Sequence, residues 1–546
     1  MRHTAFLLFL LLSWNVLSQE VPVHFRNEGV YDLLDELTAL GYTDLDLATG
    51  SLSSRSIRQA LSGAADSLPG NSRLAQTLRN HLAPLRFEEE AVPAGPVRTR
   101  SILEGLRQFP DAAVNSDLLS IRDSRFWLRI KPLLGAEGMV NAHGMEYWRR
   151  SGLAFTAGMG RHWGFWGGLA DHYESVRLSE VKDITLRPGA NYKISGEGGE
   201  YSEARGGISY AWDWGDITIA KDDIRWGSGY HGTSIFGGRA PSFPFLKLHL
   251  NPAKWLEFNY FHGWLISGVI DSSRTGWYSN AYGTERREYF YDKYIAANLF
   301  TVRPMEKLSI SFGNSIIYSD DQPKFAFFIP FLFWKSVDHT LTGAGSSRLG
   351  QNSQMFFDIS SYQLRRFHFY ASLFVDEISF SRLWDKDEHS NFFGMKAGMA
   401  VYDLPARNFR FILEYTRNNP LVYRHNTPLT TFESNHYNLG SYLPDNADEI
   451  YFSLRWTPLP MGWVQYSYTG LRLGPDYTSL GADRLGLPFM ESENWSSGCH
   501  ELRLRYEVFA HLALNAAFLS TWPGRPQPAF LPNSGPTYTF GLNWNY

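Results

Sequence analysis

The C-terminal segment alternates between large apolar and small polar residues. In its last ten residues, TYTFGLNWNY, the apolar set is Tyr538, Phe540, Leu542, Trp544 and Tyr546. Residues two apart along a β-strand point to the same face, so this segment has one apolar face and one polar face. Such a strand must lie between an apolar environment and water. An edge strand of a soluble β-sandwich would show the same pattern, and the rest of the chain has to discriminate between the two.

The same alternation recurs from about Ser124 to the C-terminus. Segments 367–376, 409–416 and 501–508 each place large apolar residues on one phase and polar or charged residues on the other. We count roughly eighteen such segments, each near the ten or so residues that a tilted membrane-spanning strand needs. The pattern predicts a mostly β protein, a transmembrane antiparallel β-barrel of about 18 strands.

The connectors between these segments alternate in length. The short connectors are 251–255, 303–307, 403–408, 457–462 and 508–511, and the long ones are 267–286, 320–354, 417–448, 474–497 and 523–535. Short periplasmic turns and long external loops are typical of outer-membrane barrels, whereas a soluble sandwich has no reason to sort its loops. Counting back from Tyr546, the last strand ends on the short-turn side. Its terminal aromatic resembles the signal that the outer-membrane assembly machinery reads.

The N-terminal part of the chain has a different character. Residues 1–19 combine a basic start with an apolar core and predict a secretory signal peptide. Amphipathic helical spacing follows in three segments, 29–42, 51–67 and 71–87, and Glu88 to Arg100 reads as a linker. We therefore expect residues 20–115 to form a small periplasmic helical bundle, or plug, ahead of an outer-membrane β-barrel at residues 116–546.

Composition and motifs argue against several functions. A net charge of −4 gives no reason to expect nucleic-acid binding, which normally shows a basic domain, so no nucleic-acid partner is expected. The single cysteine, Cys499, rules out a disulfide framework and a multi-cysteine metal site. No H-E-x-x-H or G-x-S-x-G motif is present. We expect no enzyme, no cofactor and no metal, although a serine–histidine–acid set assembled from distant positions stays open.

The stretch WGSGYHG contains a G-x-G-x-x-G pattern at Gly227, Gly229 and Gly232. A dinucleotide site needs this pattern between a buried strand and a helix, and no helical spacing follows it here. We interpret it as a tight glycine loop, which lets the backbone pack closely where the chain turns or folds inward.

Charged residues on the polar phase of the strands are expected to face the lumen of the barrel. They are Asp376, Arg410, Glu414, Arg455, Arg503, Arg505 and Glu507. Their mixed signs favour a cross-linked, narrowed interior over an ion filter of one sign. A selective pore and a structural charge network both stay open.

The long connectors are rich in aromatic residues. They include Trp277, Tyr278, Tyr282, Tyr423, Tyr437, Tyr442, Tyr477 and Trp495. Aromatic rings among Asn, Asp and Arg suit sugars, because the C–H faces of a sugar pack on the ring while its hydroxyls form hydrogen bonds. Anchoring at the membrane interface would use the same residues, so both interpretations stay open.

Several stretches resemble the Wzi family of capsule-assembly outer-membrane proteins. They are RWGSGYHGTSIFGGRAPSFPFLKL (225–248), PFLFWKSVDHTLTGAGSSRLGQNSQMFFDIS (330–360), LEYTRNNPLVYRHNTPLTTFESNHYNLGSYLPDNADEIYFSLRW (413–456) and the N-terminal VPV…YDLLDEL. The resemblance implies a barrel of about 18 strands with a helical bundle at its periplasmic mouth, and a lectin-like role in attaching capsule. The Trp-Gly-Pro-Gly of the family is Trp226-Gly227-Ser228-Gly229 here, so this turn lacks the rigid proline.

We therefore expect a protein of the outer membrane of a Gram-negative bacterium that binds and anchors capsular or surface polysaccharide through its extracellular loops. The candidate ligand-binding residues are Trp226, Tyr230, His231, Arg417, Tyr423, His425 and Tyr437. The alternatives are a channel or transporter for small solutes, and a structural subunit of a secretion or assembly complex. The expected partners are outer-membrane lipid, surface polysaccharide, the assembly machinery during biogenesis and a periplasmic or outer-membrane protein that docks on residues 20–115.

Overall fold

The structure is a computed structural model, and it describes most of the chain. The described residues are 21–70, 72–88, 98–101, 117–281, 283–337, 350–378, 380–382, 385, 391–477, 486–509, 511–522 and 535–545. The predicted signal peptide, Tyr282 and most of the predicted linker lie outside these residues.

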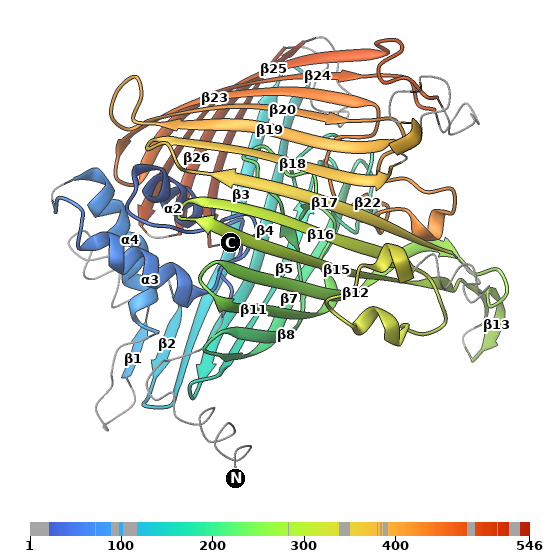
Figure 1. The fold of residues 1–546 in the computed structure, drawn as a ribbon, viewed down its shortest axis with the longest axis horizontal. Helices are drawn as coiled ribbons and strands as arrows, with labels where there is room; N and C mark the ends of the chain where they lie inside the picture. The colour runs from blue at the N-terminus through green and yellow to red at the C-terminus, as the bar shows by residue number, and fades with distance from the viewer. Residues whose placement is uncertain are drawn as a thin grey trace.

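Eighteen strands close into an antiparallel β-barrel (Figure 1). They are β3 (Phe126–Asn141), β4 (Gly144–Met159), β5 (Trp163–Glu174), β7 (Gly198–Trp212), β8 (Gly215–Asp222), β11 (Phe243–Ala253), β12 (Leu256–Ile270), β15 (Phe290–Met305), β16 (Leu308–Tyr318), β17 (Gln351–Ser361), β18 (Phe367–Glu377), β19 (Phe392–Tyr402), β20 (Phe409–Asn418), β23 (Ala447–Leu459), β24 (Gly462–Leu473), β25 (Trp495–Phe509), β26 (Leu512–Trp522) and β27 (Gly535–Trp544). The barrel closes where β27 pairs with β3, from Tyr538 opposite Val140 to Trp544 opposite Leu134. Closure leaves no open edge, and the predicted fold class is confirmed.

The alternation along each strand sorts the side chains between the two faces of the wall. In β27, Tyr538 is 46% exposed, Phe540 63% and Leu542 38%, whereas Thr537 is 3% exposed. Leu502 and Leu504 of β25 are exposed in the same way. A continuous outer surface of this kind is costly in water and fits contact with lipid acyl chains.

The two ends of the barrel differ in the length of their connectors, as predicted. Short turns join the strands at the end where the helices lie, and long connectors join them at the other end (Figure 1). The hairpin between β3 and β4 is a short exception at the long-connector end. Within the long connectors lie short strand pairs and turns: β6 (Lys193–Ser195), β9 (Arg225–Trp226), β10 (Phe236–Gly237), β13 (Gly276–Asn280), β14 (Gly283–Arg287), β21 (Glu433–Ser434), β22 (Tyr437–Asn438), η2 (Phe380–Arg382) and η3 (Pro428–Thr430).

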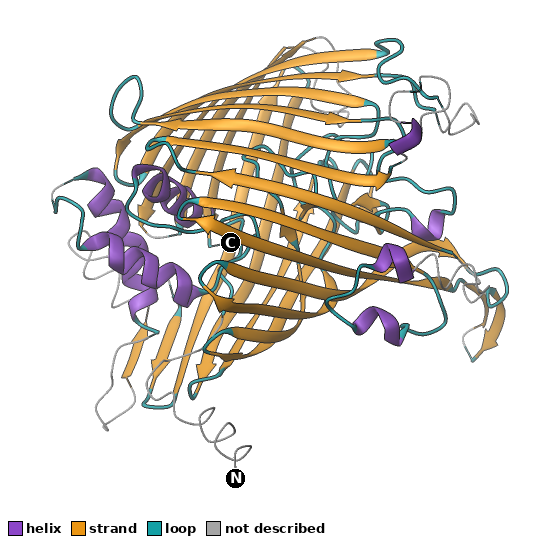
Figure 2. Cartoon of the chain, in the orientation of Figure 1, coloured by secondary structure: helices purple, strands orange, loops and turns teal. Residues whose placement is uncertain are grey.

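The three predicted N-terminal helices are α2 (Glu28–Leu40), α3 (Ser54–Ala65) and α4 (Arg73–Arg86). Ser53 caps α3, because its hydroxyl accepts a hydrogen bond from the backbone N–H of Ser56. The apolar faces of the helices form one buried cluster that also includes Tyr402 and Ile412 of the barrel, so the bundle packs on the wall at the short-turn end (Figure 2). None of the described helices is long and apolar enough to cross a membrane.

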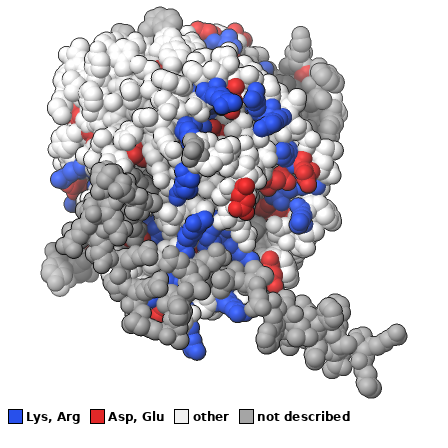
Figure 3. Space-filling model, turned by 90° about the vertical axis from the view of Figure 1, so that its left-hand side faces the viewer, with Lys and Arg blue, Asp and Glu red and all other residues white. Residues whose placement is uncertain are grey.

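A short hairpin follows the helices. Its strands are β1 (Arg98–Ser101) and β2 (Leu119–Arg122), and β2 pairs with the first residues of β3. Residues 98–100 belong to the predicted linker, and the structure corrects the prediction there, because these residues form a strand with a partner about twenty residues further along the chain. Seen from this end, basic and acidic side chains are interspersed among uncharged ones (Figure 3).

Candidate functional site

Helix α2 is tied to the barrel wall by Asp32. Its carboxylate accepts a hydrogen bond from Arg410 Nη1 at 2.6 Å and a second one from Arg455. Burial by itself would raise the pKa of Asp32, but the two guanidinium groups outweigh burial and hold the pKa well below its usual range. The carboxylate is therefore ionised at neutral pH. Two of the predicted lumen charges, Arg410 and Arg455, hold the helix in place.

Asp35 lies one turn further along the same helix, within a group of tyrosines. It is 4% exposed and accepts hydrogen bonds from the hydroxyl of Tyr362, at 2.7 Å, and from that of Tyr402. Neither carboxylate is among the site residues predicted from the sequence. Residues three apart on a helix share a face, so Asp32 and Asp35 lie together on the side of α2 opposite Val30, Leu33 and Leu37. In the sequence this pair reads as an ordinary solvent-facing side of an amphipathic helix, which is why it carried no signal.

Glu414 of β20 holds the glycine loop in the lumen. Its carboxylate accepts hydrogen bonds from the backbone N–H of Tyr230 at 2.7 Å and of His231 at 2.8 Å. The Tyr370 hydroxyl at 2.5 Å and Lys396 Nζ at 3.4 Å complete its partners. Gly227, Gly229 and Gly232 all have positive φ, which confirms the interpretation of WGSGYHG as an inward, closely packed glycine loop.

Three long connectors pack against one another inside the barrel and form what we call the roof: residues 175–191, 223–242 and 419–446. The hydroxyl of Tyr437 donates to the carbonyl oxygen of Ser179 at 2.8 Å, which joins the third connector to the first. The hydroxyl of Tyr423 donates to the carbonyl oxygen of Ser234 at 2.6 Å, which joins the third connector to the second. The roof therefore occupies the part of the lumen nearer the long-connector end, and α2 occupies the part at the short-turn end.

Three of the predicted ligand-binding residues are buried in this roof: Trp226, Tyr423 and Tyr437. Each is 2% exposed. The ring of Trp226 lies 5.2 Å from the rings of both Phe236 and Phe261. The structure corrects the prediction for these three side chains, because Tyr423 and Tyr437 join connectors to one another, Trp226 packs its connector on the wall, and each is almost wholly buried.

Gly237 tests how closely the roof is packed. A Cβ atom at this position would overlap the carbonyl oxygen of Gly440 on the facing connector. Gly237→Ala should therefore push the two connectors apart and destabilise the roof by about 1–3 kcal/mol. We expect faster limited proteolysis within 419–446 while the barrel stays folded. Gly63→Ala, whose Cβ meets nothing within 4 Å, is the control, and equal cleavage of both variants would contradict close packing.

A cavity of about 1030 Å³ lies in the lumen between α2 and the roof. Of the predicted ligand-binding residues, Tyr230 and His231 line it. The ring of His231 stacks on that of Tyr451 at 4.1 Å, and the guanidinium of Arg455 lies 4.1 Å from the ring of Trp463. The cavity thus offers aromatic faces and hydrogen-bonding groups, the two features that a sugar or another polar solute needs.

The other two predicted ligand-binding residues do not line the cavity. The guanidinium of Arg417 lies 3.7 Å from the centre of the Phe489 ring. His425 Nδ1 lies 2.6 Å from the hydroxyl of Thr430, within the same connector. The structure therefore does not bring the predicted ligand-binding residues together into one site.

The remaining predicted lumen charges pair with their neighbours. Arg503 contacts Glu501 at 2.7 Å, and Arg505 contacts Glu507 at 3.2 Å. Asp376 accepts a hydrogen bond from an asparagine amide of β17 at 3.1 Å. These contacts place compensated charges of both signs along the inner wall, an arrangement that narrows a lumen more readily than it selects one ion.

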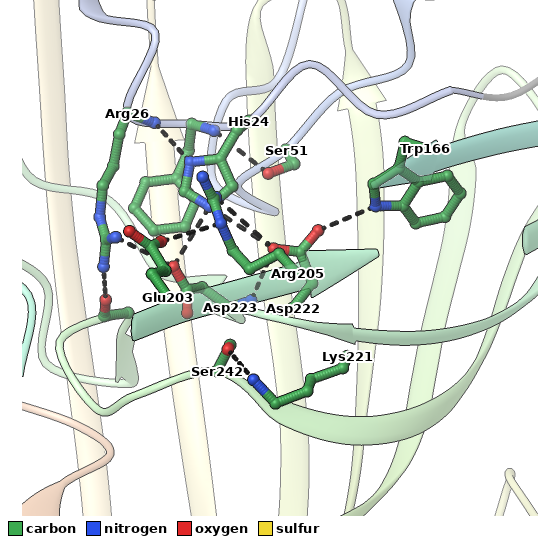
Figure 4. Close-up of polar contacts among 12 residues, drawn as sticks. His24, Arg26, Ser51, Trp166, Glu203, Arg205, Lys221, Asp222, Asp223 and Ser242 are labelled. Atoms are coloured by element: carbon green, nitrogen blue, oxygen red, sulfur yellow. Dashed lines mark hydrogen bonds and ion pairs between the residues drawn. The ribbon is translucent and has the colours of Figure 1, made fainter. Parts of the chain in front are cut away.

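A second polar network ties the N-terminal segment to the end of β8 (Figure 4). His24 Nε2 lies 3.2 Å from Asp223 and 3.7 Å from Asp222. Arg26 contacts Asp223 at 3.1 Å, and Arg205 contacts Asp222 at 3.7 Å. In the described part of the chain, the ligand atoms of His24, Asp222 and Asp223 lie within 4.8 Å of one another, close enough to hold a metal ion. Since two guanidinium groups already contact the carboxylates, the arrangement favours an ion-paired tie between the segment and the wall.

The hairpin of β13 and β14 projects beyond the barrel at the long-connector end (Figure 1). Trp277 is 72% exposed and Tyr278 is 43% exposed. Arg286 lies directly opposite Trp277 in the hairpin register. Among the other aromatic residues predicted to decorate the loops, Tyr442 and Tyr477 are buried and Trp495 is partly buried.

No family model and no curated protein matches this sequence. Among solved structures, the chain aligns with Wzi from Escherichia coli over 96% of this chain and 99% of that chain, with a TM-score of 0.57 and 13% identity. The chain has a Wzi-like fold. The solved structure is described as an outer-membrane protein involved in group 1 capsule assembly and as a carbohydrate-binding β-barrel.

The Wzi-like barrel also aligns with porins. Acinetobacter baumannii OccAB2 covers 77% of this chain at a TM-score of 0.41 and 10% identity, with 97% of that chain aligned. A BenF-like porin from Pseudomonas fluorescens covers 76% of this chain at 0.41 and 11% identity, with 98% of that chain aligned. Both scores lie below 0.5, and neither bears on function.

Proposed function

We propose that this protein is an outer-membrane barrel that binds surface polysaccharide through its extracellular loops. The observation that carries the proposal is the hairpin of β13 and β14, which holds Trp277 and Tyr278 in solvent beside Arg286. Exposed rings next to a hydrogen-bond donor suit the apolar faces and hydroxyl groups of sugars. The description of the Wzi structure as carbohydrate-binding supports the same function.

The proposal places residues 116–546 in the outer membrane and residues 20–115 in the periplasm. Outer-membrane barrels keep short turns on the periplasmic side, and the helices lie at the short-turn end. The projecting hairpin then faces the cell exterior, where surface polysaccharide is found.

Binding of capsular extract to the purified protein tests this function. We expect Trp277→Ala to weaken binding about tenfold, equivalent to about 1.4 kcal/mol, because one stacking face is lost. Trp255→Ala is the matched control, since Trp255 is 57% exposed but lies at a short turn on the opposite end.

Two outcomes would count against polysaccharide binding. One is equal affinity of the Trp277→Ala and Trp255→Ala variants, and the other is no retention of extract by the unmodified protein. In cells, deletion of the gene should leave capsule synthesised but released from the surface, and normal retention would contradict an anchoring role.

The second candidate function is a channel for small polar solutes, which the lumen cavity of about 1030 Å³ favours. Conductance of the pure protein in a planar lipid bilayer distinguishes the two functions. Steady openings of uniform size favour the channel, whereas silence favours a binding protein whose lumen is blocked by α2 and the roof.

A further inference from the structure

The connector between β16 and β17 begins by folding back over the outside of the barrel. We call residues 324–337 the strap; it contains η1 (Phe325–Phe328) and a helical turn at 334–337. Short helical segments lie in front of β12 and β15 (Figure 2). Phe327 and Trp334 of the strap form one buried cluster with outward side chains of the wall: Phe258, Tyr260, Tyr294, Ala296, Ile316 and Tyr318.

The strap lies outside the wall, because the opposite phase of the same strands faces the lumen. Phe261 of β12 and Ile317 of β16 belong to a different cluster, which includes Trp226 of the roof. Successive residues of a strand point to opposite faces, so the cluster under the strap is on the exterior. The sequence predicts an external loop at 320–354, and the structure corrects this for residues 324–337, which pack on the outer wall.

Two asparagines stand on the outward phase of the wall beneath the strap. Asn298 of β15 and Asn314 of β16 lie opposite each other in the ladder. Asn298 Nδ2 donates to the carbonyl oxygens of Pro330 at 2.9 Å and Leu332 at 3.0 Å. The backbone N–H of Trp334 donates to Asn314 Oδ1 at 3.0 Å. Amide side chains facing lipid without partners would be costly, and here they satisfy the backbone of the strap.

Two more polar side chains of the outer wall serve the backbone of the strap in the same way, and His262 contacts one of them. The hydroxyl of Tyr260 donates to the carbonyl oxygen of Phe327 at 2.9 Å. The hydroxyl of Tyr318 accepts a hydrogen bond from the backbone N–H of Lys324 at 3.2 Å and lies 2.8 Å from His262 Nε2. Irregular backbone is tolerated at membrane depth only where protein groups satisfy it, and the wall supplies those groups.

The described residues of the strap also carry four exposed apolar side chains. They are Phe325 at 83% exposure, Ile329 at 43%, Phe331 at 58% and Phe333 at 49%. On either side of the strap the outer wall continues the same surface, with exposed Ile217 on β8 and exposed Phe312 and Phe357 on β16 and β17. The strap therefore covers part of the outer wall and presents an apolar surface of its own in place of the wall it covers.

We propose that the strap is embedded in the membrane, between the barrel wall and lipid acyl chains, and that Phe325, Ile329, Phe331 and Phe333 contact those chains. The occupant is lipid because the surface is continuous with the outer wall, which faces acyl chains on both sides of the strap. This inference rests on the proposed place of the barrel in the outer membrane. It assigns to part of a predicted external loop a second role, as a lipid-contacting layer that widens one sector of the barrel.

Spin labels on single cysteines test the proposal in lipid vesicles. In a Cys499→Ser background, labels at Phe331→Cys and Phe333→Cys should be reached by oxygen, which dissolves in lipid, and protected from a water-soluble nickel complex. Leu514→Cys on the outer wall of β26 is the lipid-facing control, and Trp277→Cys on the hairpin is the water-facing control.

The outcomes distinguish a failure of the strap proposal from a failure of the proposed membrane placement. Nickel access at the strap with lipid-like access at Leu514→Cys overturns the strap proposal alone. Nickel access at Leu514→Cys overturns the membrane placement as well. Broadening of the Phe331→Cys spectrum by a second label would identify a second copy of the chain as the occupant and would also overturn the proposal.

Asn298→Leu provides an independent test of how the strap is held. Leucine suits an outward position of a barrel strand, so the barrel should still fold. The carbonyl oxygen of Pro330 loses its donor, and that of Leu332 keeps only the longer hydrogen bond from Asn314 Nδ2 at 3.4 Å. We expect nickel access at Phe331→Cys to rise several-fold. Unchanged access would show that the outer-wall amide does not hold the strap.

Discussion

Asp32→Ala should release the N-terminal helices from the barrel while leaving the barrel folded. The substitution removes the shared partner of Arg410 and Arg455 and leaves two guanidinium groups unpaired in the lumen. Breaking a buried ion pair on one side costs about 3–5 kcal/mol, and we expect the lower end because water reaches the partly exposed Asp32 side chain. Hydrogen exchange of the α2 amides in detergent should accelerate accordingly.

Two further variants serve as references for the hydrogen exchange of Asp32→Ala. Asp66→Ala removes an exposed carboxylate after α3 and should leave exchange of α2 unchanged. Asp32→Asn keeps a hydrogen-bond acceptor but loses the charge. Its α2 amides should exchange faster than those of Asp66→Ala and more slowly than those of Asp32→Ala. Exchange in Asp32→Ala at the unmodified rate would mean that apolar packing, and not the ion pairs, holds the helix.

Glu414→Ala should produce a comparably large loss, this time in the lumen. The Glu414 carboxylate serves the backbone N–H groups of Tyr230 and His231, and it also pairs with Lys396, whose side chain is 1% exposed. Removing it leaves a buried ammonium group without its counter-charge, at a cost of about 3–5 kcal/mol. The temperature at which the folded band converts to the unfolded band in SDS gels should fall markedly.

Glu414→Gln is the control for shape. It retains the side-chain volume and one acceptor oxygen, and it should lose only part of the heat stability. A Glu414→Ala variant as heat-stable as the unmodified protein would show that the glycine loop is held by its own packing. A spin label at Tyr230→Cys provides an independent measurement of how the glycine loop is held. The label should become more mobile when Glu414→Ala is added.

The strand phases could be predicted because they depend on local sequence alone. In 501–508 and 537–544, large apolar residues recur every second position, and no distant contact is needed to decide which face they occupy. The exposure of Tyr423 and Tyr437 could not be predicted in this way. A connector residue is exposed or buried according to which other connector packs on it, and that partner lies hundreds of residues away in the chain.

The sequence contains a signal for the strap that a search for alternating apolar residues does not detect. Asn298 and Asn314 stand on the apolar phase of otherwise regular strands, where a side chain facing lipid should be apolar. Next to them in sequence is KFAFFIPFLFW at 324–334, which is too apolar for a loop in water. A polar break on the outer phase beside an apolar connector is a pattern that other barrel sequences can be searched for.

The anchoring of α2 has a consequence for how the molecule matures. Asp32 precedes its partners Arg410 and Arg455 by 378 and 423 residues. In a chain delivered from its N-terminus, as the proposed place in the outer membrane implies, α2 has no guanidinium group to bind until β20 and β23 are in place. Leu34 and Leu37 can already pack on Ile57, Leu61 and Leu78 of the neighbouring helices. The bundle can therefore form early, whereas its attachment to the barrel depends on strands close to the other end of the chain.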